Sequence, residues 1–517
     1  MKIGFASIYS YRPQPEHLAY LAKLLQSSGH TVKFLTCDAS VSKCYIQLLR
    51  EQGKLRECPK CVLGGLRSYT TSGIHRISAK SKAGLPEQVL DELCASSSYT
   101  LARTETKEDR DSQLAVTLKR SLYEPVDILV GSTLEWIREE GLEGIICFNG
   151  RMDLPRGITY ACERLEIPYI TSERHWLGHG LQLIPNANCL SLKERERFNR
   201  EYADKPLTNE QASLAGKLAA QRFLRKNELE WRLYNITATK TSWPIGGTGM
   251  KVLILPSSKN EFDGHKEWTA EWDDYTIAID HLLGIMDLSP SRCILRCHPN
   301  WAEKIGKRDG FSSERHYTNW AARRNIFCIG SRETADTYDL INEADLIIVN
   351  GSTTGIEAAL LGKRVICLGH ATYQGAGLCI QVTKSTDWNA LSQSKHHDHE
   401  LVARRALRHL YTEACRFPQY VKFVRARTTT RYNYYEGADP ERIVKIFESG
   451  SLTTDDSIYG ADLRGEDEVI EKIFARKWAE LVNWREKPME LRRFPVNRRA
   501  GLRSLDSIRE MYSKGDK

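Results

Sequence analysis

Short apolar runs alternate with amphipathic stretches along most of this 517-residue chain. In the first 200 residues, continuous apolar runs predict buried strands at residues 2–8, 31–36, 144–148 and 168–171. Helical periodicity predicts helices at residues 17–28, with Gly29 directly after, and at residues 156–165. Alternating strands and helices are typical of a doubly wound parallel sheet. We therefore expect an α/β, Rossmann-like domain at residues 1–205, with an insertion at residues 50–110.

The same pattern restarts after a polar, helix-rich stretch at residues 206–245, which we expect to be a helical connector. Five more apolar runs predict strands at residues 251–255, 293–296, 326–329, 346–349 and 364–368. They indicate a second Rossmann-like domain at residues 246–430, followed by a helical tail at residues 431–517. The amphipathic stretch 466–484 is expected to pack back on the first domain. Two such domains would face each other across a cleft lined by strand ends, where ligands bind in these sheets.

Composition and charge narrow the class of protein. The hydrophobic fraction is 41% and the charged fraction 27%, as in soluble globular proteins. No run approaches the roughly 18 apolar residues of a membrane span, and the apolar start is too short for a signal peptide, so we expect a cytoplasmic protein. The net charge of +8 permits an anionic partner, but basic and aromatic residues do not interleave as they do in nucleic-acid binders.

Two local clusters invite other interpretations. Arginines gather in the tail, at Arg492, Arg493, Arg498, Arg499 and Arg503. Solvated surface charge explains them, and peripheral contact with the inner face of a membrane or with a glycan phosphate stays open. Four cysteines with one CxxC pair, namely Cys37, Cys44, Cys58 and Cys61, have the residue type of a structural zinc site, although zinc ribbons usually carry two such pairs. We expect no metal and reduced thiols.

The strongest chemical signal follows the apolar run at residues 346–349. Three hydroxyl residues, Ser352, Thr353 and Thr354, stand between two glycines at the predicted start of a helix. Hydroxyl donors and free backbone N–H groups at a helix start suit a phosphate. Glu357 lies about one turn further on, where its carboxylate is placed to accept from ribose hydroxyls. A simple helix cap is the alternative, but it needs fewer hydroxyls.

Two further motifs end strands of the same predicted sheet. In the first, His298 follows a strand and Pro299 stops it, so the imidazole is expected at the edge that faces the cleft. There it would donate to a phosphate. In the second, Ser257 and Ser258 form a polar loop after the first strand of the domain. A capping or core histidine explains the first motif alone, and an ordinary strand–helix turn explains the second, but three polar loops on one sheet edge favour a nucleotide site.

These motifs resemble those of the capsule polysaccharide biosynthesis proteins, which include Kdo transferases. The similarity rests on residues 255–258, 296–299, 336–341, 351–358 and 362–366. The resemblance implies a glycosyltransferase of the two-domain GT-B type, in which His298, Ser352 and Thr353 hold the phosphate of a nucleotide sugar. It further implies a donor that is often CMP-linked, with Kdo or a related acid sugar, and an acceptor that is a surface or capsular polysaccharide or a glycolipid.

The first domain carries two motifs that look like the acceptor side of this family, at residues 148–151 and 171–175. They place Asn149, Arg151 and Arg174 near the acceptor or the donor sugar. The second motif departs from the family pattern, because Ser172 stands where a histidine is usual. Glycosyl transfer needs a carboxylate as general base or nucleophile. Glu173 and Asp153 are the candidates, with Glu173 expected just beyond a strand end and Asp153 before a helix.

Other functions remain compatible with the sequence. A transferase of polyol phosphate from a CDP-linked donor, of the teichoic-acid type, uses similar phosphate-gripping loops, as does a sugar-nucleotide epimerase of the GT-B type. A glycan-assembly scaffold that retains the fold without catalysis is the non-enzymatic alternative. We expect no cofactor beyond the nucleotide-sugar donor, because no Asp-x-Asp pair follows a predicted strand, and activity is therefore expected to persist in EDTA.

Overall fold

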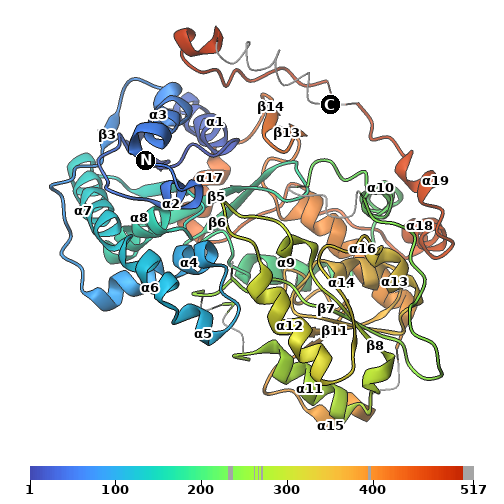
Figure 1. The fold of residues 1–517 in the computed structure, drawn as a ribbon. Coiled ribbons are helices and arrows are strands. Elements are labelled where there is room, and N and C mark those ends of the chain that lie inside the picture. Colours follow the sequence, from blue (N-terminus) through green and yellow to red (C-terminus); the bar gives the residue numbers. More distant parts are fainter. Residues whose placement is uncertain are drawn as a thin grey trace.

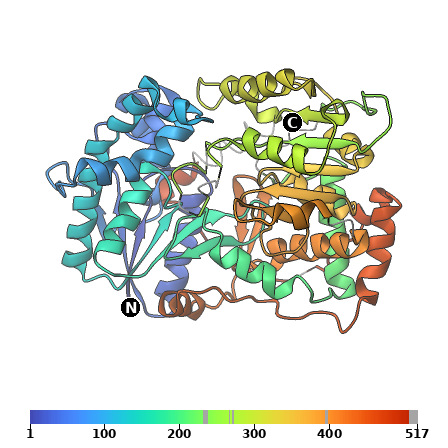
Figure 2. The same ribbon diagram turned by 90° about the horizontal axis from the view of Figure 1, so that it is seen from below.

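The computed structural model describes residues 1–230, 237–260, 262–265, 267–268, 272–393, 397–488 and 490–504. Parts of the predicted connector and of the predicted tail lie outside the described residues. Two α/β domains lie side by side, each built on its own sheet (Figures 1 and 2). The predicted fold class is thereby confirmed: two Rossmann-like, doubly wound domains in a GT-B arrangement.

The first sheet has the order β3-β2-β1-β4-β5-β6. Its strands are β1 (Lys2–Ala6), β2 (Thr31–Thr36), β3 (Ile74–Arg76), β4 (Gly144–Phe148), β5 (Tyr169–Arg174) and β6 (Leu181–Pro185). All neighbours pair in parallel except β5 and β6, which are antiparallel. The strand order reverses between β1 and β4, and the loops beyond the carboxyl ends of these strands form the topological switch point of the sheet.

The predicted insertion is an integral part of this domain rather than an appendage. It contains β3, which pairs with β2 at the edge of the sheet, and α4 (Glu87–Ala102), which packs against α7 (Tyr123–Glu140) and α8 (Asp153–Arg164). The remaining helices are α1 (Gln14–Ser27), α2 (Tyr45–Arg50), α3 (Lys54–Gly64), α5 (Lys107–Arg110) and α6 (Gln113–Arg120). The strand β3 escaped prediction because it is three residues long and half polar.

The second sheet repeats the same topology, in the order β12-β11-β10-β7-β8-β9, and its strands are all parallel. They are β7 (Val252–Leu255), β8 (Cys293–Arg296), β9 (Phe327–Ile329), β10 (Leu346–Val349), β11 (Arg364–Leu368) and β12 (Ile380–Val382). The helices are α11 (Tyr275–Ile285), α12 (Phe311–Arg323), α13 (Thr337–Glu343), α14 (Thr354–Leu360), α15 (Trp388–Gln393) and α16 (His399–Tyr411). Here the order reverses between β7 and β10, which places the switch point beyond their carboxyl ends.

Two helices lead from the first domain to the second. The helix α9 (Lys193–Tyr202) precedes the predicted connector, and α10 (Asn209–Phe223) lies within it, with an alanine-rich face in the core of the second domain. Against α10 pack α16 and two tail helices, α18 (Arg464–Phe474) and α19 (Trp478–Val482). The contact is close: a side chain at Gly216 of α10 would begin 2.7 Å from Val469 of α18.

The expected packing of the tail is therefore wrong in part. The apolar face of residues 466–484 covers the second domain rather than the first, because α10 offers small residues that accept it (Figure 2). The first domain is instead met by α17 (Glu441–Ser449), whose Phe447 ring fills the space beside Gly144. Before α17 lies a hairpin that the sequence did not predict, formed by β13 (Val424–Thr428) and β14 (Arg431–Tyr434).

Beyond α19 the chain runs back across the hairpin to the first domain, where Phe494 and Val496 pack against its core (Figure 1). Of the helices in the described part of the chain, none combines the length and the apolar character that crossing a bilayer requires.

Candidate functional site

A cavity of about 460 Å³ lies at the switch point of the second sheet. Loops after β7, β8 and β10 line it, together with the end of α10 and the residues that follow that helix. The structure brings together here all the residues predicted to bind a donor: Ser257, Ser258, His298, Ser352, Thr353, Thr354 and Glu357. We call this space the donor cavity. The roles of the individual residues in it remain predictions.

The two central loops of the donor cavity are tied to each other by Asn350. Its side-chain oxygen accepts from the backbone N–H of Ser257 at 2.6 Å and from the Ser257 hydroxyl at 3.1 Å. Its amide nitrogen donates back to the Ser257 carbonyl at 3.3 Å. The Ser258 hydroxyl in turn accepts from the Trp301 indole at 2.7 Å. The ends of β7 and β10 are thus fixed before any ligand enters.

The loop after β10 turns tightly into α14. Gly351 has φ +90°, and a side chain there would begin 2.5 Å from the carbonyl oxygen of His370, so only glycine fits. At the start of α14 the hydroxyls of Ser352 and Thr354 lie 2.7 Å apart. The tight turn at Gly351 therefore places the hydroxyls of Ser352 and Thr354 together at the wall of the donor cavity.

Three arginines that were not among the predicted site residues also line the donor cavity: Arg222, Arg225 and Arg296, the last of which belongs to the motif at residues 296–299. Arg225 pairs with Asp336, and Arg296 donates to the Glu333 carbonyl at 3.0 Å. Arg222 is on the predicted connector helix and Arg225 directly follows it, where no motif marks them. A pair of arginines three residues apart near the end of a polar helix was the one available signal.

Glu357 lies at the base of the donor cavity and is 1% exposed. Its Oε1 accepts from Nε of Arg222 at 2.7 Å, and Arg222 also donates from Nη1 to both carboxylate oxygens of Glu230 at 2.8 Å. The second oxygen, Oε2 of Glu357, is buried without a hydrogen-bond partner among the described residues. It is the kind of acceptor that a ligand hydroxyl satisfies.

Glu173 lies within β5 rather than beyond its end. The strand continues to Arg174 because it pairs with β6, which the sequence did not predict. The Glu173 carboxylate accepts from the side chains of Gln14 and Asn149, the latter at 3.1 Å, and from the backbone N–H of Arg174 at 3.1 Å. Burial raises the pKa of Glu173 to about 7, and the hydrogen bond from Asn149, which lowers the pKa, offsets this only in part. Such a carboxylate changes charge near neutral pH, as a general base must.

Asp153 is the first residue of α8 and is fully buried. Its carboxylate accepts from the Tyr9 hydroxyl and from the backbone N–H of Tyr45 at 3.1 Å, while its own N–H donates to Ser97 at 2.7 Å. Burial raises its pKa to about 6, and the hydrogen bond from Tyr9 opposes the shift. These contacts hold Asp153 in the interior of the first domain, away from the lining of the donor cavity.

The two remaining predicted arginines also make internal contacts. Arg151 donates from Nη1 to the hydroxyls of Ser96 and Thr100, at 3.0 Å each, on α4. Arg174 donates to the Leu229 carbonyl, in the segment that leads to Glu230 at the donor cavity. The first-domain candidates are therefore close to one another around β4 and β5, but they do not line the donor cavity.

The four N-terminal cysteines lie in the loop after β2 and in α3. Burial raises the thiol pKa of Cys37, Cys44 and Cys58, which keeps these sulfurs protonated. Among the described residues, no group of three or more His, Cys, Asp or Glu side chains is arranged to hold a metal ion.

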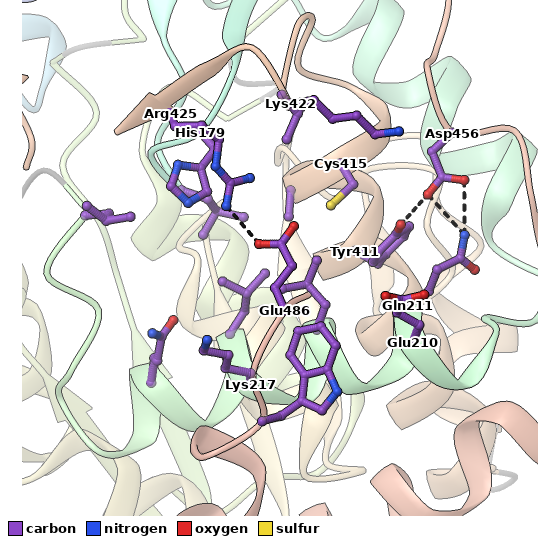
Figure 3. Close-up of a pocket in the computed structure, with 18 of the residues that line it drawn as sticks. His179, Glu210, Gln211, Lys217, Tyr411, Cys415, Lys422, Arg425, Asp456 and Glu486 are labelled. Atoms are coloured by element: carbon purple, nitrogen blue, oxygen red, sulfur yellow. Dashed lines mark hydrogen bonds and ion pairs between the residues drawn. The ribbon is translucent and has the colours of Figure 1, made fainter. Parts of the chain in front are cut away.

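A larger cavity of about 900 Å³ adjoins the donor cavity, and Asn227 and Glu230 line both. Its walls come from α10, from the end of α16 and from the tail after α19 (Figure 3). Charged groups on these walls are held by one another: Arg425 pairs with Glu486 at 2.8 Å. Leucines and the Trp484 ring supply apolar surface between them. A mixed apolar and polar lining is typical of a site for an organic ligand.

The family model described as capsule polysaccharide biosynthesis protein matches residues 288–420. No curated protein matches the sequence significantly.

Among solved structures, the chain is similar to the Thermosulfurimonas dismutans KpsC beta Kdo 2,4 transferase, with a TM-score of 0.35 and 18% identity over 54% of this chain and 82% of that one. For the beta Kdo 2,7 transferase of the same organism, the TM-score is 0.31 and the identity 13%, over 67% and 89%. For Acinetobacter baumannii MurG the TM-score is 0.26 and the identity 12%, over 79% of this chain and 94% of that one. The family match spans the loops after β8 and β10, which carry His298 and Ser352. Four of the five motifs that resemble this family, at residues 296–299, 336–341, 351–358 and 362–366, lie within the match.

Proposed function

We propose that this protein is a GT-B glycosyltransferase that binds a nucleotide sugar in the donor cavity. The observation that carries the proposal is that seven residues predicted from three separate strand-end motifs line one cavity at the switch point of the second sheet. In this proposal His298 and the hydroxyls of Ser352, Thr353 and Thr354 hold the donor phosphate. Glu357 accepts a ribose hydroxyl through Oε2, the oxygen that Arg222 does not engage.

Charged groups of both signs surround the donor cavity. Three arginines and two glutamates are the residues of fixed charge among its described lining, and Arg225 also pairs with Asp336, so cations and carboxylates are equal in number. The proposed donor therefore rests on the motifs and not on net charge. It is CMP-linked and carries Kdo or a related acid sugar, and a surface or capsular polysaccharide or a glycolipid is the proposed acceptor. The cytoplasmic location, possible membrane contact and absence of a metal requirement expected from the sequence are part of this proposal.

We place the acceptor in the larger cavity, because it opens beside the donor cavity and shares Asn227 and Glu230 with it. Transfer requires a base for the acceptor hydroxyl, and Glu173 is our candidate, with Asp153 as the alternative. Neither lines the cavities in this arrangement. Their participation therefore requires the first domain to close on the second. Such closure completes the catalytic site in many enzymes.

Titration calorimetry with CMP, CDP, UDP and GDP tests the proposal. We expect CMP to bind, and His298→Ala to weaken it by about 1–3 kcal/mol, the contribution of a charge-assisted hydrogen bond. His281→Ala is the matched control, because His281 is exposed on α11 and contacts Trp388 instead of the cavity. Binding of none of the four nucleotides would contradict the proposal and favour the scaffold. Preference for CDP with transfer from a CDP-polyol would favour the phosphotransferase.

A further inference from the structure

A third cavity, of about 660 Å³, lies where the hairpin β13–β14 and the returning tail meet the first domain. Six arginines line it: Arg12, Arg427, Arg431, Arg493, Arg498 and Arg503. Of its described lining residues, Glu16 is the one carboxylate, and it pairs with Arg12 at 3.4 Å. The lining therefore carries a large excess of positive charge. It shares no residue with the donor cavity or with the larger cavity beside it.

The arginines come from three parts of the chain that hydrogen bonds hold in place. The tail lies along β14. The backbone N–H of Phe494 donates to the Tyr434 carbonyl, and the backbone N–H of Glu436 donates to the Arg492 carbonyl, at 2.9 Å each. Further on, the N–H of Arg499 donates to the Ser68 carbonyl of the first domain at 2.7 Å. The tail segment passes beside the hairpin (Figure 1), and its arginines line the same cavity as those of the hairpin and of the loop after β1.

Aromatic residues line this cavity beside the arginines. Tyr434 is 6% exposed, and its hydroxyl lies 2.9 Å from Nδ1 of His17 on α1. The Phe494 ring meets the Tyr20 ring edge-on, with centroids 5.1 Å apart. Tyr69 and Tyr432 also line the cavity. Flat apolar rings among cations offer both of the contacts that a charged sugar makes: stacking of its C–H face and pairing of its acid group.

The excess of guanidinium groups over carboxylates in the lining attracts anions. All six cations are arginines, whose planar fork binds carboxylate or phosphate through two parallel hydrogen bonds. A cavity lined by aromatic rings suits a compact ring that carries an acid group. Basic side chains attract an anionic bilayer by charge alone, so the aromatic lining favours the sugar.

We infer that this cavity binds an anionic glycan through the carboxylates or phosphates of its sugar units. The site goes beyond the proposed transfer reaction, since it lies apart from the donor cavity and needs no nucleotide. It would hold a stretch of acidic chain on the first domain and the tail. The arginines of the tail therefore complete a binding site instead of forming a solvated charged surface.

Titration calorimetry with tetragalacturonate, an acidic sugar oligomer, tests this inference, and neutral maltotetraose is the ligand control. We expect the full-length protein to bind tetragalacturonate and not maltotetraose. The affinity should fall when the salt concentration rises from about 50 to about 500 mM, because salt screens exposed charges. No nucleotide is present, so failure of this site and failure of the donor cavity give separate results.

The informative variant is Arg427→Gln/Arg493→Gln, because both side chains belong to exposed residues and their replacement leaves the fold intact. We expect about tenfold weaker binding or more for each arginine removed. Arg120→Gln/Arg464→Gln removes the same charge from side chains that are 67% and 87% exposed outside the cavity, and it should bind as the wild type does.

Two results would overturn the inference. One is equal loss of affinity in both double variants, which would mean that net charge alone attracts the glycan. The other is binding to vesicles of phosphatidylcholine and phosphatidylglycerol without binding to tetragalacturonate, which would assign the arginines to a membrane surface.

Discussion

Arg222 connects two carboxylates at the wall of the donor cavity, and its replacement tests how this wall is held. Its guanidinium group donates to Glu357 on α14 and to Glu230 in the segment after α10. Arg222→Met retains most of the length of the side chain and removes the charge and the donors. The Trp176 ring lies 5.1 Å from the guanidinium carbon of Arg222, and in the variant the methionine side chain would still pack beside it.

The cost of this change follows from burial. Glu357 is 1% exposed and would keep a buried charge without its cation, whereas the Glu230 side chain is 13% exposed and can turn toward water. Removing one partner of a buried ion pair costs about 3–5 kcal/mol. We expect Arg222→Met to destabilise the second domain by this amount, nearly all of it through Glu357. Nucleotide affinity should fall as well, because Glu357 would no longer be oriented.

Urea unfolding of Arg222→Met, Glu357→Gln and the double variant measures the effect. The double variant should be more stable than Arg222→Met, because a neutral glutamine leaves no buried charge behind. Arg324→Met is the matched control: its side chain and that of its partner Asp280 are 32% and 33% exposed, so no buried charge is left behind and we expect a loss of about 1 kcal/mol or less. A loss below about 1 kcal/mol in Arg222→Met, or additive losses in the double variant, would refute this account of the wall.

Three further predictions concern the candidate residues. Glu173→Gln should lower turnover by about 100-fold with little change in nucleotide affinity, and wild-type turnover should rise with pH through about 7, where this carboxylate loses its proton. Asp153→Asn should chiefly change stability. Because burial raises the pKa of Asp153 to about 6, its protonated carboxyl stabilises the folded state fully below pH 3.8, and this stabilisation is lost as the pH rises through 6. The free energy of unfolding, measured in urea, should therefore depend less on pH in the variant than in the wild type. Ser352→Ala should weaken CMP binding by about 1–3 kcal/mol without changing the unfolding midpoint, as calorimetry and urea unfolding will show.

Buried parallel strands were the most predictable part of this fold. The strands β2, β4, β8, β10 and β11 match the predicted bounds, because strands covered on both faces are continuous apolar runs. Edge strands such as β3 and β12 are three residues long and only half apolar, so no run marks them. The helix against which the tail packs was also not predictable, since the apolar face of α18 does not indicate which helix it contacts.

The donor cavity was predictable for a related reason. Each of its strand-end motifs is local in sequence, and a parallel sheet brings the carboxyl ends of its strands to one edge. Arg222 was not predictable, because its contact with Glu357 joins residues 135 positions apart and no local pattern records it. The surroundings of Glu173 were missed for a similar reason, since they depend on the pairing of β5 with β6 and on Gln14 from α1.

The shared strand order of the two domains bears on which carboxylate acts in transfer. In the second domain the switch point between β7 and β10 is open and forms the donor cavity. In the first domain the equivalent place, beyond β1 and β4, is filled by the protein itself: the buried Tyr9 donates to Asp153, which also accepts from Tyr45. A ligand would have to displace these bonds to reach Asp153, at the cost of leaving buried polar groups unpaired. Glu173 lies one strand further along, partly exposed and with a pKa near 7, so it can exchange a proton with a substrate at a lower cost. We therefore expect the first domain to act through β5 and to use its own switch point as a structural support.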